Sequence, residues 1–127
     1  MLVLLDFSKA YDTVWKQKLL NSMMNTVVPT RYVRWLHGFL QNRQARIRYD
    51  GKLGKSKQMM QGLPQGSVLA PLLFLFYINN LAELMPDYNT TAMFADDVSI
   101  LASDNKKEQA TKKAQAAVDI VIKWSKE

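Results

Sequence analysis

The spacing of apolar residues changes along the chain, from patterns typical of strands to patterns typical of helices. The continuous apolar run at residues 1–5 predicts a short buried strand that delivers Asp6 at its C-terminal end. A four-residue apolar period then predicts a helix from residue 12 to about 27, and Pro29 ends it and suits the first turn of a second helix. The expected apolar faces are Trp15, Leu19 and Met23 on the first helix, and Tyr32, Trp35, Leu36, Phe39 and Leu40 on the second.

The period changes to two between residues 44 and 60. Apolar residues alternate with arginines there, and Asp50-Gly51 is a typical two-residue hairpin turn. The pattern predicts a two-stranded basic ribbon. The alternating positions are Ala45, Ile47 and Tyr49 on one side and Arg46 and Arg48 on the other.

A loop at residues 62–67 precedes the most apolar part of the chain. Ser67 is a suitable N-cap for a helix that runs to about Leu84, and we expect Leu63 and residues 68–76 to lie in the core. The run at 68–78 contains a proline and is shorter than the ~20 residues that a membrane span needs. Together with the interrupted apolar start, this predicts a soluble, intracellular protein that is not secreted and has no membrane partner.

The C-terminal third predicts a hairpin followed by a helix. Residues 91–102 are strand-like on both sides of Asp96-Asp97, which places the two carboxylates at the hairpin tip. Residues 106–124 have the amphipathic pattern of a helix. The aromatic residues Trp35, Phe39 and Trp124 lie on helical apolar stripes and are expected in the core rather than on a base-stacking surface. The inner face of the last helix is predicted to carry Ala110, Ala114, Ala117, Val118, Val121 and Ile122. The order β, α, α, ββ, α, ββ, α fits a two-layer α+β domain that spans residues 1–127.

Composition narrows the chemistry that this domain can perform. The chain has no cysteine, which excludes disulfides, cysteine-based zinc sites and thiol catalysis, and His37 is its single histidine. A metal ion would therefore have to be held by carboxylates. The formal charge is +6, and residues 31–60 carry eight Lys or Arg against Asp50 alone, so one segment holds the positive excess.

Asp6, Asp96 and Asp97 are carboxylates attached to otherwise apolar strands. Each alone is read more readily as a cap or a solvated turn residue. If the three converge, they repel one another by ~1 to ~4 kcal/mol per pair at 4 Å, depending on the local dielectric. A divalent cation removes this conflict, and oxygen ligands favour Mg²⁺ or Mn²⁺.

Three segments resemble, in order, the palm motifs of reverse transcriptases of the non-LTR, LINE-type and Jockey-like kind. They read D-F-S-K-A-Y-D-T-V at residues 6–14, G-L-P-Q-G-S-V-L-A-P at 62–71 and F-A-D-D at 94–97. The last box is weak alone, but the combination is highly specific, and the resemblance covers nearly the whole chain. It implies a polymerase-type palm, an antiparallel sheet of RRM or ferredoxin-like type that is backed by helices.

The resemblance also implies roles for single residues. Asp6 and Asp96 would be the principal ligands of two Mg²⁺ or Mn²⁺ ions, with Asp97 completing the cluster for nucleotidyl transfer. Tyr11 would be a steric gate that selects deoxynucleotides. The backbone of Phe7 would lie near the triphosphate. Gln65 and Gly66 would lie in a loop beside the nascent base pair, where a glycine permits close approach of backbone to nucleotide or template. The implied partners are an RNA or DNA template, a primer and a dNTP.

The basic ribbon is consistent with two interpretations. Its cations could meet template or primer phosphates, which would give salt-dependent affinity without sequence selection. Alternating charges on a hairpin are otherwise a solvated face, and no aromatic platform is expected beside it. The candidate phosphate-binding residues are Arg43, Arg46, Arg48, Lys52, Lys55 and Lys57.

By the same resemblance, polymerases of this family carry further subdomains. We expect this chain to lack the N-terminal fingers, the primer grip and the thumb, and therefore to have little or no polymerase activity by itself. The main alternative is a catalytically dead, nucleic-acid-binding remnant that uses the basic hairpin. A different branch, such as a group II intron maturase, fits the motif wording less well.

Overall fold

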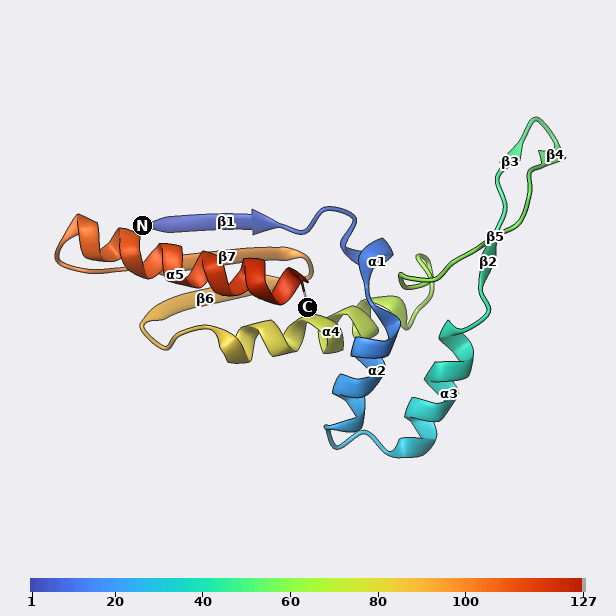
Figure 1. Cartoon of the computed structure of the whole chain (residues 1–127), viewed down its shortest axis with the longest axis horizontal. Helices are drawn as coiled ribbons and strands as arrows, with labels where there is room; N and C mark the ends of the chain where they lie inside the picture. The colour runs from blue at the N-terminus through green and yellow to red at the C-terminus, as the bar shows by residue number, and fades with distance from the viewer. Residues whose placement is uncertain (127) are drawn as a thin grey trace. The chain divides into compact units, whose positions relative to one another are not determined.

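The computed structural model describes residues 1–126, which fall into two compact units. Unit 1 consists of Met1–Ser8 and Ile78–Glu127, and unit 2 consists of Lys9–Tyr77. Figure 1 labels the elements, and the units are described separately. The elements are β1 (Leu2–Asp6), α1 (Ala10–Thr13), α2 (Lys16–Met24), α3 (Thr30–Leu40), β2 (Gln44–Ala45), β3 (Arg48–Tyr49), β4 (Lys52–Leu53), β5 (Lys57–Gln58), α4 (Ala70–Leu84), β6 (Asn89–Phe94), β7 (Asp97–Ala102) and α5 (Lys107–Lys126). The predicted α+β class is confirmed, with an antiparallel sheet and helices.

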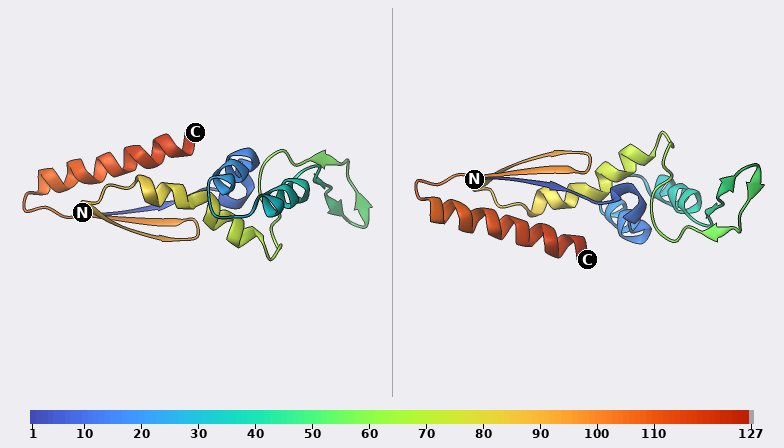
Figure 2. Two further views of the ribbon diagram at one scale, coloured as in Figure 1. Left: turned by 90° about the horizontal axis from the view of Figure 1, so that it is seen from below. Right: turned by 90° about the horizontal axis from the view of Figure 1, so that it is seen from above.

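Unit 1 is built on a three-stranded antiparallel sheet in the order β1-β7-β6. Strand residues alternate between the two faces, and Val98, Ile100 and Ala102 of the central strand are buried. Helix α5 packs on this buried face, as both views of Figure 2 show. The other face of the sheet carries exposed residues on all three strands.

Helix α5 reaches the sheet through small side chains. Ala110, Ala114 and Ala117 are buried, so the helix backbone approaches the strands closely. The predicted inner face is wrong at Ile122, which is 44% exposed, and Val118 is half-buried. Trp124 is buried instead, as predicted, and packs edge-on against the ring of Phe7 with 5.7 Å between centroids.

The prediction that the first strand is buried is also wrong. Leu2 and Leu4 are 60% and 70% exposed, whereas Val3 and Leu5 are half-buried. β1 is an edge strand, and α5 covers only the face toward which Val3 and Leu5 point. A continuous apolar run does not distinguish a strand that is covered on one face from a strand that is covered on both.

In unit 2, the helix predicted from residue 12 to 27 is divided into α1 and α2. The N–H of Leu63 donates to the Tyr11 carbonyl at 2.8 Å, and the N–H of Gly62 donates to the Val14 carbonyl at 2.9 Å. The Tyr11 and Val14 carbonyls therefore accept hydrogen bonds from the loop at residues 62–63 and not from the next turn of a continuous helix. Trp15 becomes the N-cap of α2 and is 50% exposed, so its assignment to the apolar face of that helix is wrong.

Helices α2 and α3 pack together in unit 2. Their buried faces consist of Leu19, Leu20 and Met23 on α2 and Val33, Leu36 and Leu40 on α3. The prediction for α3 is correct at Leu36 and Leu40. It is wrong at Tyr32 and Trp35, which are 51% and 57% exposed. Pro29 is the N-cap and lies just before the first turn.

The basic ribbon is confirmed as a hairpin with an interrupted ladder. β3 pairs with β4 next to the turn, and β2 pairs with β5 at the base. Asp50 and Gly51 both have positive φ, 47° and 72°, as a type I′ turn requires. Every residue from 44 to 58 is exposed, so the alternation buries neither face of the ribbon.

Helix α4 begins at Ala70, two residues later than a Ser67 N-cap requires. The Ser67 hydroxyl instead accepts the N–H of Leu69 at 3.2 Å in the turn before the helix. Leu63 is buried, as predicted, but residues 68–76 are core only in part. The buried side chains are Ala70, Leu73 and Phe74, whereas Val68, Leu72 and Leu75 are 94%, 52% and 52% exposed.

Candidate functional site

Two of the three candidate carboxylates lie side by side in unit 1. Asp6 is the last residue of β1 and Asp97 is the first residue of β7, and the register pairs them directly. Side chains that are directly opposite in an antiparallel pair share a face, with Cβ atoms about 4.5–5.5 Å apart. Both residues are exposed, so the pair lies on the face of the sheet that α5 does not cover.

Asp96 lies next to this pair in the β6–β7 turn. The turn consists of Ala95 and Asp96, because Phe94 pairs with Asp97 across the hairpin. The predicted position of the carboxylates at a hairpin tip is therefore confirmed. Ala95 has a φ of 50°, a conformation that L-residues rarely adopt, and Asp96 is half-buried.

The three carboxylates have no hydrogen bond or ion pair through their side chains within residues 1–126. Asp6 and Asp97 therefore face each other without a neutralising partner, which is unfavourable unless a cation or water screens them. Their oxygen donors and their shared position fit a hard divalent cation such as Mg²⁺ or Mn²⁺. Within the described residues 1–126, no three or more His, Cys, Asp or Glu side chains form a group that could hold a metal ion. The structure brings Asp6 and Asp97 together, and the assignment of all three aspartates as metal ligands stays a prediction.

The open face around the pair is mostly apolar. Phe94 lies opposite Asp97 on the side away from Asp6, and its ring is 82% exposed. Farther along the sheet, Leu4 pairs with Ser99 on the same face. Sequence reasoning did not select Phe94 as a site residue. Its strand-end position two residues before Asp96 is the signal that identifies it.

Phe7 follows Asp6 but is not exposed on the open face. Its ring is half-buried and contacts Trp124 of α5. The side chain of Phe7 thus anchors the end of β1 to the covering helix. The predicted nucleotide contact concerns its backbone, and that assignment stays a prediction.

Unit 2 joins the segment after Asp6 to the loop at residues 62–66. The Gln65 side-chain amide donates to the Asp12 carboxylate at 2.7 Å. The ring of Tyr11 stacks on buried Phe74 of α4, with 4.8 Å between centroids and an interplanar angle of 22°. Tyr11 and Gln65, which were predicted as nucleotide-binding residues, are therefore attached to one local framework within this unit.

Glycines shape this loop at two positions. Gly66 has a φ of +82°, and a Cβ added there meets no atom within 4 Å. Gly62 has a φ of +83°, and a Cβ added there would lie 2.7 Å from the carbonyl oxygen of Asp12. The approach of backbone to a nucleotide or template that the resemblance implies at Gly66 stays a prediction. The close packing of Gly62 against the Asp12 backbone within this chain was not identified from the motif.

The cations are strongly partitioned between the units. Unit 2 contains eleven Lys and Arg against Asp12 and Asp50, a net charge of +9, whereas unit 1 has a net charge of −3. Arg43 is half-buried and the other five candidate phosphate-binding side chains are exposed. The basic hairpin therefore presents its cations to solvent without acidic neighbours in sequence other than Asp50.

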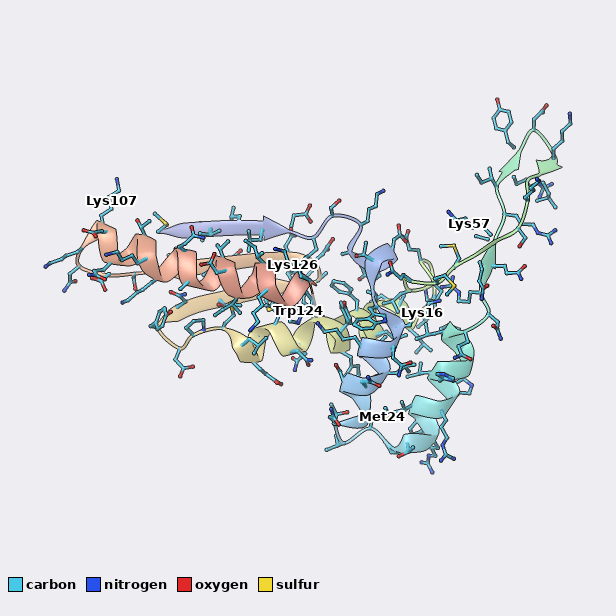
Figure 3. The ribbon with its side chains drawn as sticks, viewed as in Figure 1. Lys16, Met24, Lys57, Lys107, Trp124 and Lys126 are labelled. Carbon is cyan, nitrogen blue, oxygen red and sulfur yellow. The ribbon has the colours of Figure 1, made fainter. Side chains whose placement is uncertain are left out.

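Lys16 is a cation that sequence reasoning missed. Its Nζ donates to the Met59 carbonyl at 2.6 Å, and the Met59 N–H donates to the Arg43 carbonyl at 2.8 Å. Figure 3 shows Lys16 at the start of α2 and Lys57 on β5. Partial burial, and secondly the charge of nearby Arg43, lower the pKa of Lys16. Lys16 and Arg43 thus form a local centre of positive charge at the base of the hairpin.

The family model and the similar proteins that match this chain are all reverse transcriptases, that is, RNA-directed DNA polymerases. A family model described as reverse transcriptase (RNA-dependent DNA polymerase) matches residues 1–127. A probable RNA-directed DNA polymerase from transposon BS of Drosophila melanogaster is 31% identical over 98% of this chain and 14% of its own length. The polymerase from the mobile element jockey of the same species is 28% identical over 95% of this chain and 14% of its own length. A probable polymerase from transposon X-element, also from Drosophila melanogaster, is 33% identical over 76% of this chain and 11% of its own length.

This chain thus spans about one seventh of the length of the relatives it matches. None of the helices within residues 1–126 has the length and apolar character that crossing a membrane requires.

Proposed function

The chain belongs to the reverse transcriptase family, and on this premise we propose that it is the palm segment of an RNA-directed DNA polymerase from a Jockey-like, non-LTR retrotransposon. The observation that carries the proposal is the pairing of Asp6 with Asp97 on the open face of the sheet. An antiparallel sheet with one face covered by a helix and acidic residues on the other suits a polymerase palm. The open face leaves room for a nucleic-acid substrate.

Asp6, Asp96 and Asp97 are the proposed metal-binding and catalytic residues. When bound, divalent cations would supply charge neutralisation for the triphosphate and a lowered pKa for the primer 3′-hydroxyl. Asp6 and Asp97 would hold the cations from the ends of β1 and β7, and Asp96 would do so from the turn between β6 and β7. Catalysis of this type depends on positioning and charge, which explains how it proceeds without cysteine or a histidine base.

Tyr11, Gln65 and Gly66 are the proposed nucleotide-contacting residues, with Phe7 contributing its backbone. The stack on Phe74 limits the motion of the Tyr11 ring. A ring with restricted motion can exclude a 2′-hydroxyl, which would select deoxynucleotides. The Gln65 contact with Asp12 orients the amide that would lie beside the new base pair.

The experiment that tests this proposal is a titration with Mn²⁺, followed by the electron paramagnetic resonance signal of the free ion. We expect the 127-residue chain to bind Mn²⁺, and Asp6→Asn and Asp97→Asn to weaken binding by about tenfold or more, because one charge of the opposed pair is lost. Asp87→Asn is the matched control, since Asp87 is an exposed acid of the same unit. Binding that Asp6→Asn and Asp87→Asn reduce equally would contradict the proposal.

A second candidate function is nucleic-acid binding without catalysis. It is favoured by the fully exposed hairpin and the net charge of +9 on unit 2. In that case Mn²⁺ binding would be weak and unaffected at Asp6. Oligonucleotide affinity would instead fall with added salt and with Arg46→Ala and Arg48→Ala.

A further inference from the structure

Helix α3 exposes aromatic rings on the side that does not pack against α2. Trp35 is 57% exposed and stacks on Phe39 one turn later, with 5.4 Å between centroids and an interplanar angle of 9°. Tyr32, 51% exposed, lies beside this pair on the helix surface. The core face of α3 is provided by other residues, so the stacked rings are not needed to close the core of this unit.

Cations accompany these rings. The guanidinium of Arg31 lies 4.9 Å from the centroid of the Tyr32 ring and donates to its hydroxyl at 3.3 Å. Arg31 is also one turn before Trp35, and Arg34 is exposed on the same helix. No acidic residue occurs between Asp12 and Asp50, so no local carboxylate neutralises the arginines in sequence.

Exposed flat rings beside unpaired cations match the chemistry of a single-stranded nucleic acid. Unstacked bases offer planar faces to aromatic side chains, and the phosphates between them offer negative charge to arginine. A duplex exposes its phosphates and the edges of its bases, but its bases are stacked on one another and offer no planar faces along most of its length. A protein partner for this surface would have to combine an apolar patch with acidic groups.

We propose that the exposed face of α3, centred on Trp35 and its stack with Phe39, is a binding platform for single-stranded nucleic acid. Bases stack on the Trp35 ring, and Arg31 and Arg34 meet the flanking phosphates. The platform goes beyond the metal site proposed above and does not depend on it. It adds aromatic contacts to the basic hairpin, which follows α3 in the chain and in the same unit (Figure 1).

The test is fluorescence anisotropy with a labelled oligo(dT) of about 12 nucleotides, within the usual site size for such proteins. Trp35→Ala should weaken binding by about tenfold, and Trp35→Phe should retain part of the affinity because a ring remains. Trp15→Ala is the matched control. Trp15 is an equally exposed tryptophan of the same unit, at 50%, and lies at the N-cap of α2.

Salt dependence separates stacking from charge. Trp35→Ala should leave the slope of log affinity against log salt unchanged, whereas Arg34→Ala should reduce its magnitude by about 0.7. Affinity for a blunt duplex of oligo(dT) with oligo(dA) of the same length should not change in Trp35→Ala. An Asp6→Asn variant should bind oligo(dT) as the parent chain does, so the failure of the metal site and the failure of this platform give different results.

Three outcomes would overturn the platform. One is oligo(dT) affinity that Trp35→Ala leaves unchanged in a variant that melts at the same temperature as the parent. Another is an equal loss of affinity in Trp15→Ala. The third is a Trp35→Ala effect on self-association, measured by sedimentation, without an effect on oligonucleotide binding, which would make the rings a protein contact.

Discussion

Gly62 is the glycine of this chain with the least room for a side chain. We predict that Gly62→Ala destabilises the protein by more than ~2 kcal/mol, because it combines a positive φ with a Cβ only 2.7 Å from the backbone of Asp12. Urea denaturation measures the change. The displaced contact would also disturb the bonds from residues 62 and 63 to α1.

Two other glycines provide the controls. Gly66→Ala meets open space and should lose only ~1 kcal/mol, from its positive φ. Gly38→Ala lies within α3 with open space around it and should be neutral or slightly stabilising, since alanine favours a helix by up to ~1 kcal/mol. Equal losses at Gly62 and Gly66 would mean that strain, and not the close approach, determines the effect.

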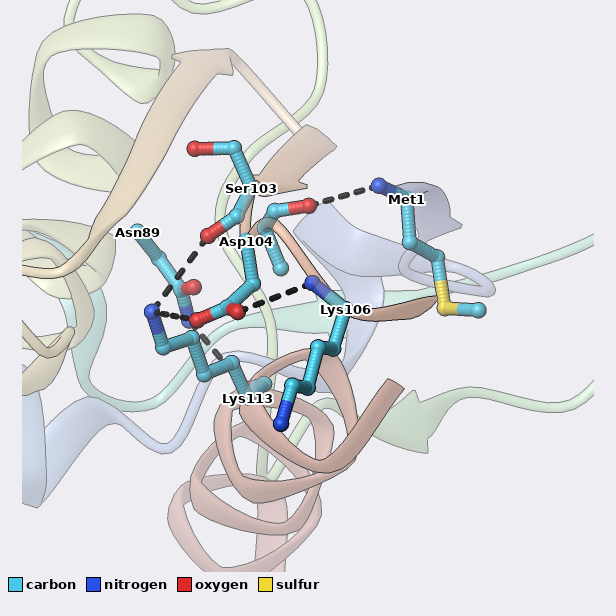
Figure 4. A network of polar contacts seen from close by, with 7 residues as sticks. Met1, Asn89, Ser103, Asp104, Lys106 and Lys113 are labelled. Atoms are coloured by element: carbon cyan, nitrogen blue, oxygen red, sulfur yellow. Dashed lines mark hydrogen bonds and ion pairs between the residues drawn. The ribbon is translucent and has the colours of Figure 1, made fainter. Parts of the chain in front are cut away.

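The Asp104 carboxylate makes polar contacts with two lysines of unit 1 (Figure 4). Its carboxylate forms an ion pair with Lys113 at 2.8 Å and accepts the N–H of Lys106 at 3.1 Å, and these hydrogen bonds lower its pKa below the usual 3.8. A lowered pKa contributes stability at pH values above 3.8, and this contribution is lost as the pH falls through the folded-state pKa.

We therefore predict a pH-dependent effect of Asp104→Asn. The variant should be slightly less stable than the parent at neutral pH, and the two melting temperatures should converge as the pH falls well below 3.8. Thermal melts across this range measure the difference. A gap that is constant down to the lowest pH would show that the carboxylate charge is not the cause.

At the scale of elements, α5 depends on small residues against β7. Ala117 is completely buried, whereas neighbouring Ala116 is exposed. We predict that Ala117→Leu destabilises the protein by ~1–3 kcal/mol, because the added methylenes have no space between helix and sheet. Ala116→Leu should change stability by less than ~0.5 kcal/mol. Chemical denaturation compares the two, and similar losses would argue against the observed orientation of α5.

Elements that are determined by residues close together in the sequence were predictable. The Asp50-Gly51 turn and the hairpin predicted at residues 91–102 follow from turn chemistry and alternation, and both are confirmed, with the first strand of the hairpin beginning at Asn89. The break between α1 and α2 was not predictable, because its cause is hydrogen bonding to a loop about 50 residues later. Trp35 was misassigned because its i, i+4 spacing with Phe39 is the same whether the rings face the core or solvent.

For the whole molecule, charge and chemistry divide along the two units. The candidate metal ligands lie in the unit with a net charge of −3, and the candidate phosphate contacts lie in the unit with +9. Motif order predicted the family, and strand patterning placed Asp6 and Asp97 at strand ends. Their direct pairing and the exposed Phe94 depend on strand register, which the sequence alone did not specify.

The central claim is that the end of β1 and the β6–β7 turn form one divalent-metal site. Paramagnetic broadening of backbone amide signals by substoichiometric Mn²⁺ tests it most directly, since broadening reports proximity to the ion. We predict that the amides of residues 6, 96 and 97 broaden together and first, and that Asp97→Asn removes this effect. Broadening spread evenly over exposed acids such as Asp87 and Asp119, with residues 6 and 97 no more affected than these, would contradict the account.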